Sequence, residues 1–277
     1  MSEPPSLPGV THDYIDAGGL RTHVALAGPA DAPPLLMVHG WPQHWWCWRH
    51  LIGPLSERYR VIAPDLRGYG WTDAPRDGYA KAQFSADMIA LLDAMGIEKV
   101  TWLGHDWGAH PGWISAFAHP ERLERLVALC VPPIFARDRS LSSLLFILSY
   151  QGPIATPFLG TMLVKRGLVE RVLKIARVKG EWTDDELRTY NDVLRAKPHV
   201  TVATYRTFLL RELLKLARGP YDASTLKVPA TVIVGDRDRI TRSTTSALYP
   251  EIEVRRVDGV GHFLPEEDPD AVLAAFS

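Results

Sequence analysis

The chain has 277 residues, of which 46% are hydrophobic and 23% are charged, and these values are ordinary for a globular protein with a large core. The formal net charge is −1 and the lysines and arginines are scattered, which excludes a strongly basic nucleic-acid-binding surface and gives no sign of an anionic membrane partner. The first ten residues lack the basic and apolar regions of a signal peptide, and the longest apolar stretch, 141–150, is too short to span a bilayer. A cytoplasmic protein is therefore expected.

Short β-type runs alternate with helical patterns in the first half of the chain and again near its end. Such alternation is typical of an α/β protein with a mostly parallel sheet and helices on both faces. The predicted strands are residues 14–16, 21–27, 35–38, 60–63, 100–103, 126–130, 231–234 and 253–257. The first two flank Gly18-Gly19 and are expected to form an antiparallel hairpin at the sheet edge. Helical patterns that should cover the sheet occupy residues 45–57, 81–95, 109–119 and 270–276.

The alternation stops at Val131-Pro132-Pro133 and resumes at Val228-Pro229. Thr183 followed by Glu186 inside this interval predicts a helix start with a capping box. A helical block placed between two strands of a sheet predicts a lid over the carboxyl ends of the strands. The predicted helices of the interval are residues 142–150, 161–177, 183–196 and 200–218. The expected division is a core of residues 1–132 and 228–277 with a helical cap of residues 133–227.

The most informative stretch is Gly104-His105-Asp106-Trp107-Gly108, which follows an apolar run and precedes a helical pattern. A strand, a turn with glycines two residues before and after its tip, and a helix are the pattern of a nucleophile elbow, whose tip is usually serine. Here the tip is Asp106. A carboxylate suits attack on an sp³ carbon with formation of an alkyl-enzyme ester. The sequence therefore predicts that Asp106 is a nucleophile.

Other loops that carry polar side chains also follow predicted strands, and an open parallel sheet places its ligands beyond the carboxyl ends of its strands. These loops are His39-Gly40-Trp41-Pro42, Asp65-Leu66-Arg67-Gly68-Tyr69-Gly70, Gly235-Asp236-Arg237-Asp238 and Gly259-Val260-Gly261-His262-Phe263. With the aspartate turn they resemble the α/β-hydrolase superfamily, in particular its aspartate-nucleophile branch of epoxide hydrolases and haloalkane dehalogenases. The resemblance covers nearly the whole chain, with nucleophile, acid and histidine in the expected order. It implies the α/β-hydrolase fold, a mostly parallel eight-stranded sheet with an inserted helical cap.

The resemblance also implies roles for a catalytic triad. Asp106 would attack the substrate, His262 would activate the water that cleaves the resulting ester, and Asp238 would orient His262. Histidine suits the second role because it is a base that is neutral near physiological pH. A buried carboxylate behind the imidazole fixes its tautomer and supports its transient charge. Asp236, two residues closer to the strand, is the alternative acid.

Cleavage of the ester passes through an oxyanion on the Asp106 carboxyl group, so backbone donors should face that group. By resemblance these donors are the amides of Trp41 and Trp107. The turn at Trp41-Pro42 is expected to contain a cis peptide bond. His39 and His105 adjoin these residues and are expected to hydrogen-bond the backbone around the turns.

An epoxide needs a hydrogen-bond donor on its oxygen as the ring opens, and epoxide hydrolases supply it from cap tyrosines. Tyr205 resembles the second of these tyrosines. The segment 149–153 resembles the aromatic-glutamine-proline segment near the first, but the usual donor position then falls on Phe146, which has no donor. Tyr150 and Tyr190 are the alternatives for that donor. Phe146, Tyr190 and Phe263 are expected to line the substrate site.

The predicted activity is hydrolysis of a small apolar epoxide by water through an ester on Asp106. A haloalkane dehalogenase with the same triad is the first alternative, and a ligand-binding member of the superfamily without catalysis is the second. No metal or other cofactor is expected, because no cluster of possible ligands has metal-site spacing and no phosphate-binding glycine loop is present. No nucleic-acid or membrane partner is expected, and a homodimer is left open.

Overall fold

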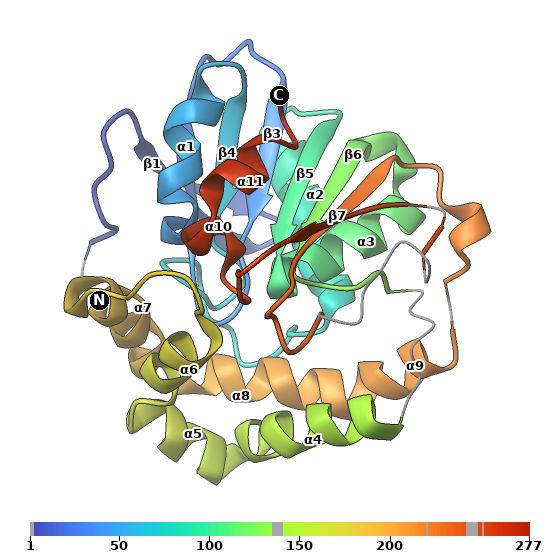
Figure 1. The fold of residues 1–277 in the computed structure, drawn as a ribbon. Helices are drawn as coiled ribbons and strands as arrows, with labels where there is room; N and C mark the ends of the chain where they lie inside the picture. Colours follow the sequence, from blue (N-terminus) through green and yellow to red (C-terminus); the bar gives the residue numbers. More distant parts are fainter. Residues whose placement is uncertain (1–2, 135–140, 220, 242–248, 251) are drawn as a thin grey trace.

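The computed structural model describes residues 3–134, 141–219, 221–241, 249–250 and 252–277. Within these ranges the strands form an eight-stranded sheet in the order β1-β2-β4-β3-β5-β6-β7-β8 (Figure 1). Strand β2 pairs antiparallel with β1 and β4, and the other neighbours are parallel. The strands are β1 (Thr11–Ala17), β2 (Leu20–Ala27), β3 (Pro34–Val38), β4 (Arg60–Pro64), β5 (Val100–His105), β6 (Leu123–Leu129), β7 (Ala230–Gly235) and β8 (Glu253–Val257). The predicted fold class and the hairpin at the sheet edge are confirmed.

The central strands are apolar because both of their faces are covered, as parallel sheets require. In β3 the residues from Leu35 to Val38 are buried without alternation, and β4 and β6 show the same pattern. Edge strand β8 instead carries charged Glu253, Arg255 and Arg256 and is only partly covered. Charged side chains on an edge strand oppose pairing with another chain.

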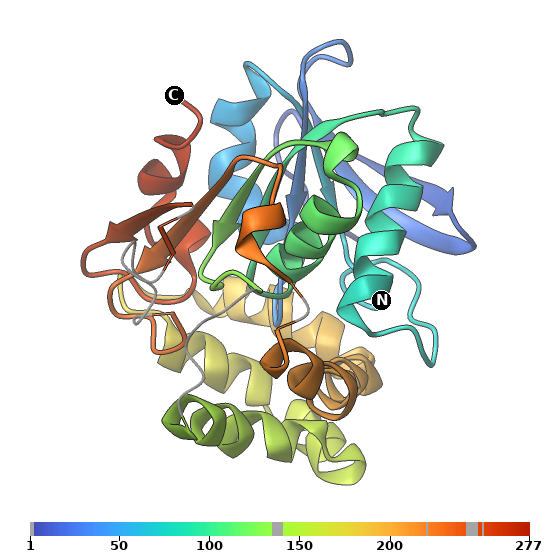
Figure 2. The ribbon, with the colours of Figure 1, turned by 90° about the vertical axis from the view of Figure 1, so that its right-hand side faces the viewer.

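Helices cover both faces of the sheet, as Figure 2 shows from the side. One face carries α1 (Arg49–Ser56), α10 (Leu264–Glu267) and α11 (Pro269–Leu273), with the short helical turn Trp45–Trp48 leading into α1. The other face carries α2 (Lys81–Ala94) and α3 (Ala109–Ala118). The sheet is therefore the middle layer of three.

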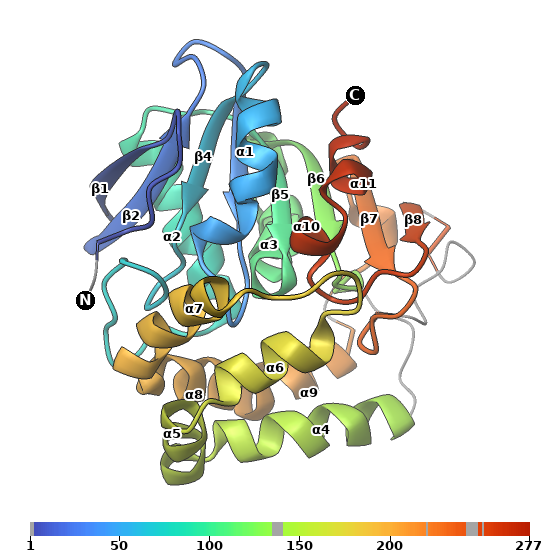
Figure 3. The ribbon, with the colours of Figure 1, turned by 60° about the vertical axis from the view of Figure 1, so that its left-hand side comes forward.

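A further helical layer lies across the ends of the strands (Figures 1 and 3). Its helices are α4 (Leu141–Ala155), α5 (Pro157–Lys165), α6 (Leu168–Ala176), α7 (Asp184–Ala196), α8 (Pro198–Thr207) and α9 (Leu213–Ala217). Hydrogen bonds tie α8 to the loops that follow β3 and β4. Trp41 Nε1 donates to Thr201 Oγ1 at 3.0 Å, Tyr69 Oη donates to Thr204 Oγ1 at 3.2 Å, and His199 Nε2 donates to the carbonyl of Ala74 at 3.4 Å. No helix within the described ranges is long and apolar enough to cross a bilayer. The boundaries of a separate cap at residues 133 and 227 stay a prediction.

The helical layer departs from the expected pattern in two places. The helix predicted over residues 161–177 is two helices, α5 and α6, because Gly167 has a φ of +87° that ends the first and starts the second. The helix predicted over 200–218 contains a π-helical turn at Phe208–Glu212. The expected capping box of α7 is present, with Glu186 N donating to Thr183 Oγ1 at 3.2 Å and Thr183 N donating to Glu186 Oε2 at 2.9 Å.

Candidate active site

Asp106 lies at the tip of a tight turn between β5 and α3. Its φ is +49°, a left-handed conformation that aspartate adopts more easily than most residues. The flanking glycines are required by close packing, since a Cβ on Gly104 would lie 2.5 Å from the carbonyl oxygen of Gly108. A Cβ on Gly108 would lie 2.0 Å from the carbonyl oxygen of Val38. The sequence therefore folds into a turn that holds the carboxyl group of Asp106 above the sheet.

The Asp106 carboxylate is held by backbone donors. Its Oδ1 accepts a hydrogen bond of 2.8 Å from the amide of Trp41, the first residue after the Gly40 turn. Gly40 must be glycine, because a Cβ there would lie 2.5 Å from Asp106 Oδ1. Burial raises the pKa of Asp106, but hydrogen bonding to His262, the charges of His262 and His105 and the amide of Trp107 outweigh burial and lower it below its usual value. Asp106 is therefore ionised at neutral pH. The Trp41-Pro42 peptide bond in the neighbouring turn is cis, as expected.

His262 lies between two carboxylates. Its Nε2 is 3.5 Å from Asp106 Oδ2, and its Nδ1 is 3.0 Å from Asp238 Oδ2. Burial alone would lower the pKa of His262, but the charges of Asp238 and Asp106 and the hydrogen bonds to both carboxylates raise it to about 10. The imidazole is therefore protonated at neutral pH while Asp106 is ionised.

The structure brings Asp238, and not Asp236, to His262. Asp238 is 2% exposed, and its carboxylate accepts hydrogen bonds from Thr241 Oγ1 at 2.6 Å and Ile240 N at 2.9 Å. Burial raises its pKa, but the charge and hydrogen bond of His262 and these two donors lower it below its usual value. Asp236 instead accepts from the amide of Gly259 at 2.8 Å, a bond that shapes the loop after β8.

Two buried histidines hold the backbone around the site. His39 Nδ1 donates to the carbonyl of Gly40 at 3.1 Å, and its Nε2 accepts from the amide of Leu66 at 3.0 Å. This pattern requires neutral His39, and burial lowers its pKa accordingly. His105 Nε2 donates to the carbonyl of His262 at 2.8 Å. These bonds fix the turn that carries the Trp41 amide and the loop that carries the His262 ring.

Tyr205 and Tyr150 face the Asp106 region from the helical layer. The Tyr205 ring, on α8, contacts Trp41 and Trp107 edge-on, with ring centroids 5.2 Å and 5.5 Å apart. The Tyr150 hydroxyl, on α4, accepts a 2.6 Å hydrogen bond from Gln151 Nε2. Burial, with a contribution from the charge of Asp106, raises the pKa of both phenols well above the usual value. Both phenols therefore keep their protons at neutral pH.

Of the three residues predicted to line the substrate site, one contacts the triad, one lies elsewhere and one is not described. Tyr190 donates its hydroxyl to Glu266 Oε1 at 2.6 Å, in a buried cluster with Arg49. Phe263 is buried and its ring packs against His262, with centroids 5.4 Å apart. The side chain of Phe146 lies outside the described part of the structure. The structure thus gathers the triad, the two tryptophan amides and two tyrosines, whereas Tyr190 joins a different hydrogen-bond network.

Two groups of side chains place three possible metal ligands within 4.8 Å of one another in the described residues. They are His105, Cys130 and His262 in the first group, and His50, Glu186 and Glu266 in the second. Both carboxylates of the second group pair with Arg49, whose positive charge opposes binding of a cation. In the first group His262 already pairs with two carboxylates. Neither group is therefore assigned as a metal site.

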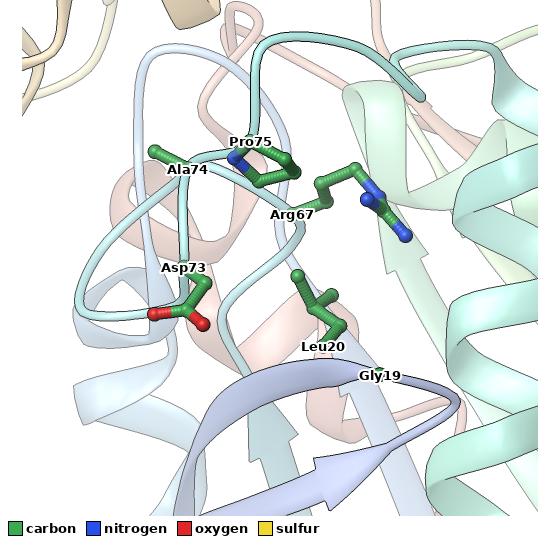
Figure 4. A pocket seen from close by; sticks show the side chains of 6 residues that line it. All are labelled: Gly19, Leu20, Arg67, Asp73, Ala74 and Pro75. Atoms are coloured by element: carbon green, nitrogen blue, oxygen red, sulfur yellow. The ribbon is translucent and has the colours of Figure 1, made fainter.

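An open pocket of about 360 Å³ lies between the β1–β2 turn and the loop after β4 (Figure 4). Its lining residues are Gly19, Leu20, Arg67, Asp73, Ala74 and Pro75. The one cation in this lining, Arg67, is held by Asp87 through hydrogen bonds of 2.7 and 2.6 Å. None of the predicted site residues lines this pocket. The pocket is therefore separate from the candidate active site.

Comparison with known proteins relates the chain to epoxide hydrolases. A family model described as alpha/beta hydrolase fold matches residues 33–147. Epoxide hydrolase 2 of Siraitia grosvenorii is 32% identical over an alignment that covers 94% of this chain and 95% of that protein. The solved structure of epoxide hydrolase CorEH without ligand has a TM-score of 0.83 and 28% identity, with 96% and 97% of the two chains covered. The epoxide hydrolase VrEH1 from Vigna radiata has a TM-score of 0.80 and 28% identity over 98% and 97%.

Proposed function

Because this chain belongs to the α/β-hydrolase family and is most similar to its epoxide hydrolases, we propose that it converts a small apolar epoxide and water to a vicinal diol. The observation that carries the proposal is an ionised carboxylate at the tip of the elbow, 3.5 Å from a histidine that a second carboxylate supports. In this proposal residues 133–227 form a cap whose tyrosines face the nucleophile.

In the first step, Asp106 attacks an epoxide carbon. The Oδ1 atom is held by the Trp41 amide, so Oδ2 is the atom that forms the new C–O bond and Oδ1 becomes the ester carbonyl. The epoxide C–O bond breaks, and its oxygen takes a proton from Tyr205 or Tyr150. The raised pKa values of these phenols keep that proton in place until the ring opens. The product of the step is an alkyl ester of Asp106.

In the second step, water cleaves this ester with His262 as the base. Ester formation removes the negative charge of Asp106, which is one of the causes of the high pKa of His262. The pKa of His262 therefore falls after alkylation, and the proton that it releases restores the phenol. Neutral His262 then takes a proton from water, while the amides of Trp41 and Trp107 stabilise the oxyanion on Oδ1. Collapse of the oxyanion breaks the bond between the carboxyl carbon and Oδ2, and the leaving alkoxide takes the proton of the new carboxyl group. The diol is released, Asp106 is ionised again and His262 is left protonated.

The proposal is tested with racemic aromatic and aliphatic epoxides and, in parallel, with 1-haloalkanes. We expect diol from at least one epoxide class. Halide release without diol from any epoxide would instead assign a haloalkane dehalogenase with Trp107 as a halide ligand. Saturable binding without either product would assign a ligand-binding protein.

Tyr205→Phe should lower epoxide turnover. An alkoxide is a poor leaving group, so loss of one donor to its oxygen should slow alkylation at least about tenfold, or about 1.4 kcal/mol in the barrier. Tyr150→Phe should add a further loss. Single-turnover alkylation rates of the two variants and of wild type measure the effect. Tyr190→Phe is the matched control, since its hydroxyl bonds Glu266, and an equal loss in this variant would contradict the assignment.

Asp238→Asn should reduce turnover severely, because the amide no longer supports the His262 imidazolium and favours the wrong tautomer, a change that costs roughly 10⁴-fold in a comparable triad. Asp236→Asn alters only a loop hydrogen bond to Gly259 and is the matched control. Steady-state turnover of the two variants shows which of the two aspartates supports His262. A damaging Asp236→Asn with a nearly silent Asp238→Asn would reverse the assignment of the acid.

A further inference from the structure

Lys81, the first residue of α2, carries an ammonium group that is buried beside the candidate site. The residue is 2% exposed, and its Nζ lies 4.1 Å from the centre of the Trp107 ring. Phe84 and Phe208 complete an aromatic enclosure, with ring centres 5.3 and 5.7 Å from Nζ. An ammonium over an indole face is an attractive contact, stronger when it is removed from water. Lys81 therefore holds the ring of the residue whose amide faces Asp106.

The counter-ion of Lys81 comes from the helical layer. Glu212 closes the π-helical turn, and its Oε2 lies 3.6 Å from Lys81 Nζ. Its Oε1 accepts a 2.7 Å hydrogen bond from the backbone amide of Lys81, so the same carboxylate also caps the start of α2. π-Helical turns occur frequently at functional sites. The position of the Lys81 charge thus depends on how the helical layer sits on the core.

The charged and titratable groups that face Lys81 are Glu212, Asp106 and His110. Burial lowers the pKa of Lys81 to about 8, and the charges of Glu212 and Asp106 partly oppose that shift. Burial and the charge of Lys81 lower the pKa of His110 to about 4, so His110 is neutral at physiological pH. Because Lys81 Nζ lies 4.1 Å from the centre of the ring of Trp107, the residue that follows Asp106, the ammonium is placed for its charge to act on the Asp106 carboxylate.

We propose that Lys81 is a positioning residue for ester hydrolysis, one that holds Trp107 beneath Tyr205 and supplies a positive charge to the Asp106 carboxyl group. The inference rests on the proposed function, in which alkylation consumes the Asp106 charge and ester hydrolysis restores negative charge on the same group. A fixed positive charge favours the step that creates an anion over the step that removes one. Lys81 therefore assists the second step and gives no help to the first.

Lys81→Met keeps the apolar stem and removes the charge. Rapid-quench measurements of the two steps, on an epoxide that wild type turns over, should show ester hydrolysis slowed about tenfold, with alkylation unchanged or slightly faster. The Lys81 pKa of about 8 in the free protein falls in the ester, because the Asp106 charge that raises it is lost. In wild type, hydrolysis should therefore fall as the pH rises through this lowered pKa, and this fall should be absent in Lys81→Met. Lys99→Met, which removes an exposed ammonium paired with Glu124, is the matched control and should change neither step.

Glu212→Gln gives an independent test if Lys81→Met does not fold. The amide still accepts from the Lys81 backbone, but its lost charge lowers the pKa of Lys81 further, so the fall in hydrolysis should move to lower pH. Equal slowing of both steps with an unchanged pH profile would overturn the proposal and leave Lys81 as a structural anchor.

The charge interaction is also measurable without an epoxide, by following the ¹³Cε resonance of Lys81 with pH. The pKa of Lys81 should fall in Asp106→Asn, since one of the charges that raises it is removed. An unchanged pKa would overturn the proposal. If Asp106→Asn lowers the pKa of Lys81 but the wild-type protein forms no diol, only the proposed function is rejected. The interaction between the two charges is then established.

Discussion

Asp106→Asn should abolish diol formation, with turnover reduced by roughly 10⁶-fold, the order seen when the nucleophile is removed from a comparable triad. The account assigns the first covalent bond to Asp106 Oδ2, and an amide at this position is not a competent nucleophile. Asparagine tolerates the left-handed conformation of the tip, so the variant should fold normally. Diol formation by the purified variant measures the effect.

The unfolding temperature of Asp106→Asn is the control. An unchanged melting temperature with lost turnover supports a chemical role, whereas a large drop would make the loss of activity uninformative. Asp106→Ala then serves as a second variant, although alanine is strained at a φ of +49°. Diol formation within about tenfold of wild type in either variant would contradict the assignment of Asp106.

His262→Gln should stop the reaction after its first step. Alkylation needs an ionised Asp106 and a phenol donor but no base, whereas hydrolysis of the ester needs a proton acceptor beside the water. The expected loss in the second step is roughly 10²- to 10⁴-fold, the usual contribution of a positioned general base. Intact-mass spectrometry should then show the protein with one added substrate mass. Loss of turnover without that adduct would contradict the assignment of His262 to the second step alone.

The pH dependence of the two steps should differ in wild type. The pKa of His262 is raised in the free protein, so its imidazole is protonated across the neutral range, and this state does not hinder alkylation. The ester lacks the Asp106 charge, so the pKa of His262 is lower there and hydrolysis rises with pH as the imidazole loses its proton. Single-turnover measurements should show alkylation flat across neutral pH while hydrolysis increases up to the pH at which Lys81 loses its proton. A parallel rise of both steps would indicate that His262 acts as a base before alkylation.

Features that depend on local pattern could be predicted from the sequence. The apolar runs predict the strands of the sheet. Gly104 and Gly108 predict the tight turn, and in the structure the backbone at both positions leaves no room for a Cβ. The capping box at Thr183 followed from two residues three positions apart. Family resemblance supplied the roles of Asp238 and His262, which lie close together in the structure while their roles stay proposals.

Features that depend on distant contacts could not be predicted in this way. The burial of Lys81 depends on the helical layer, and its partner Glu212 is 131 positions away in the chain. Tyr190 reads as a possible lining residue, but its hydroxyl bonds Glu266, 76 positions further along the chain. The break at Gly167 cannot be predicted from the pattern, because an isolated glycine is tolerated inside a helix. Burial and partner charge are properties of the assembled fold, so a sequence pattern does not report them.

The central claim, a covalent ester on Asp106, is tested most directly by a single turnover in ¹⁸O-labelled water. With protein in excess over epoxide, the oxygen added to the substrate comes from the Asp106 carboxyl group, so the first diol should carry unlabelled oxygen. The label should instead enter Asp106 and appear in the diol of later turnovers. Full labelling of the diol in the first turnover would mean that water attacks the epoxide directly, and would contradict the covalent mechanism.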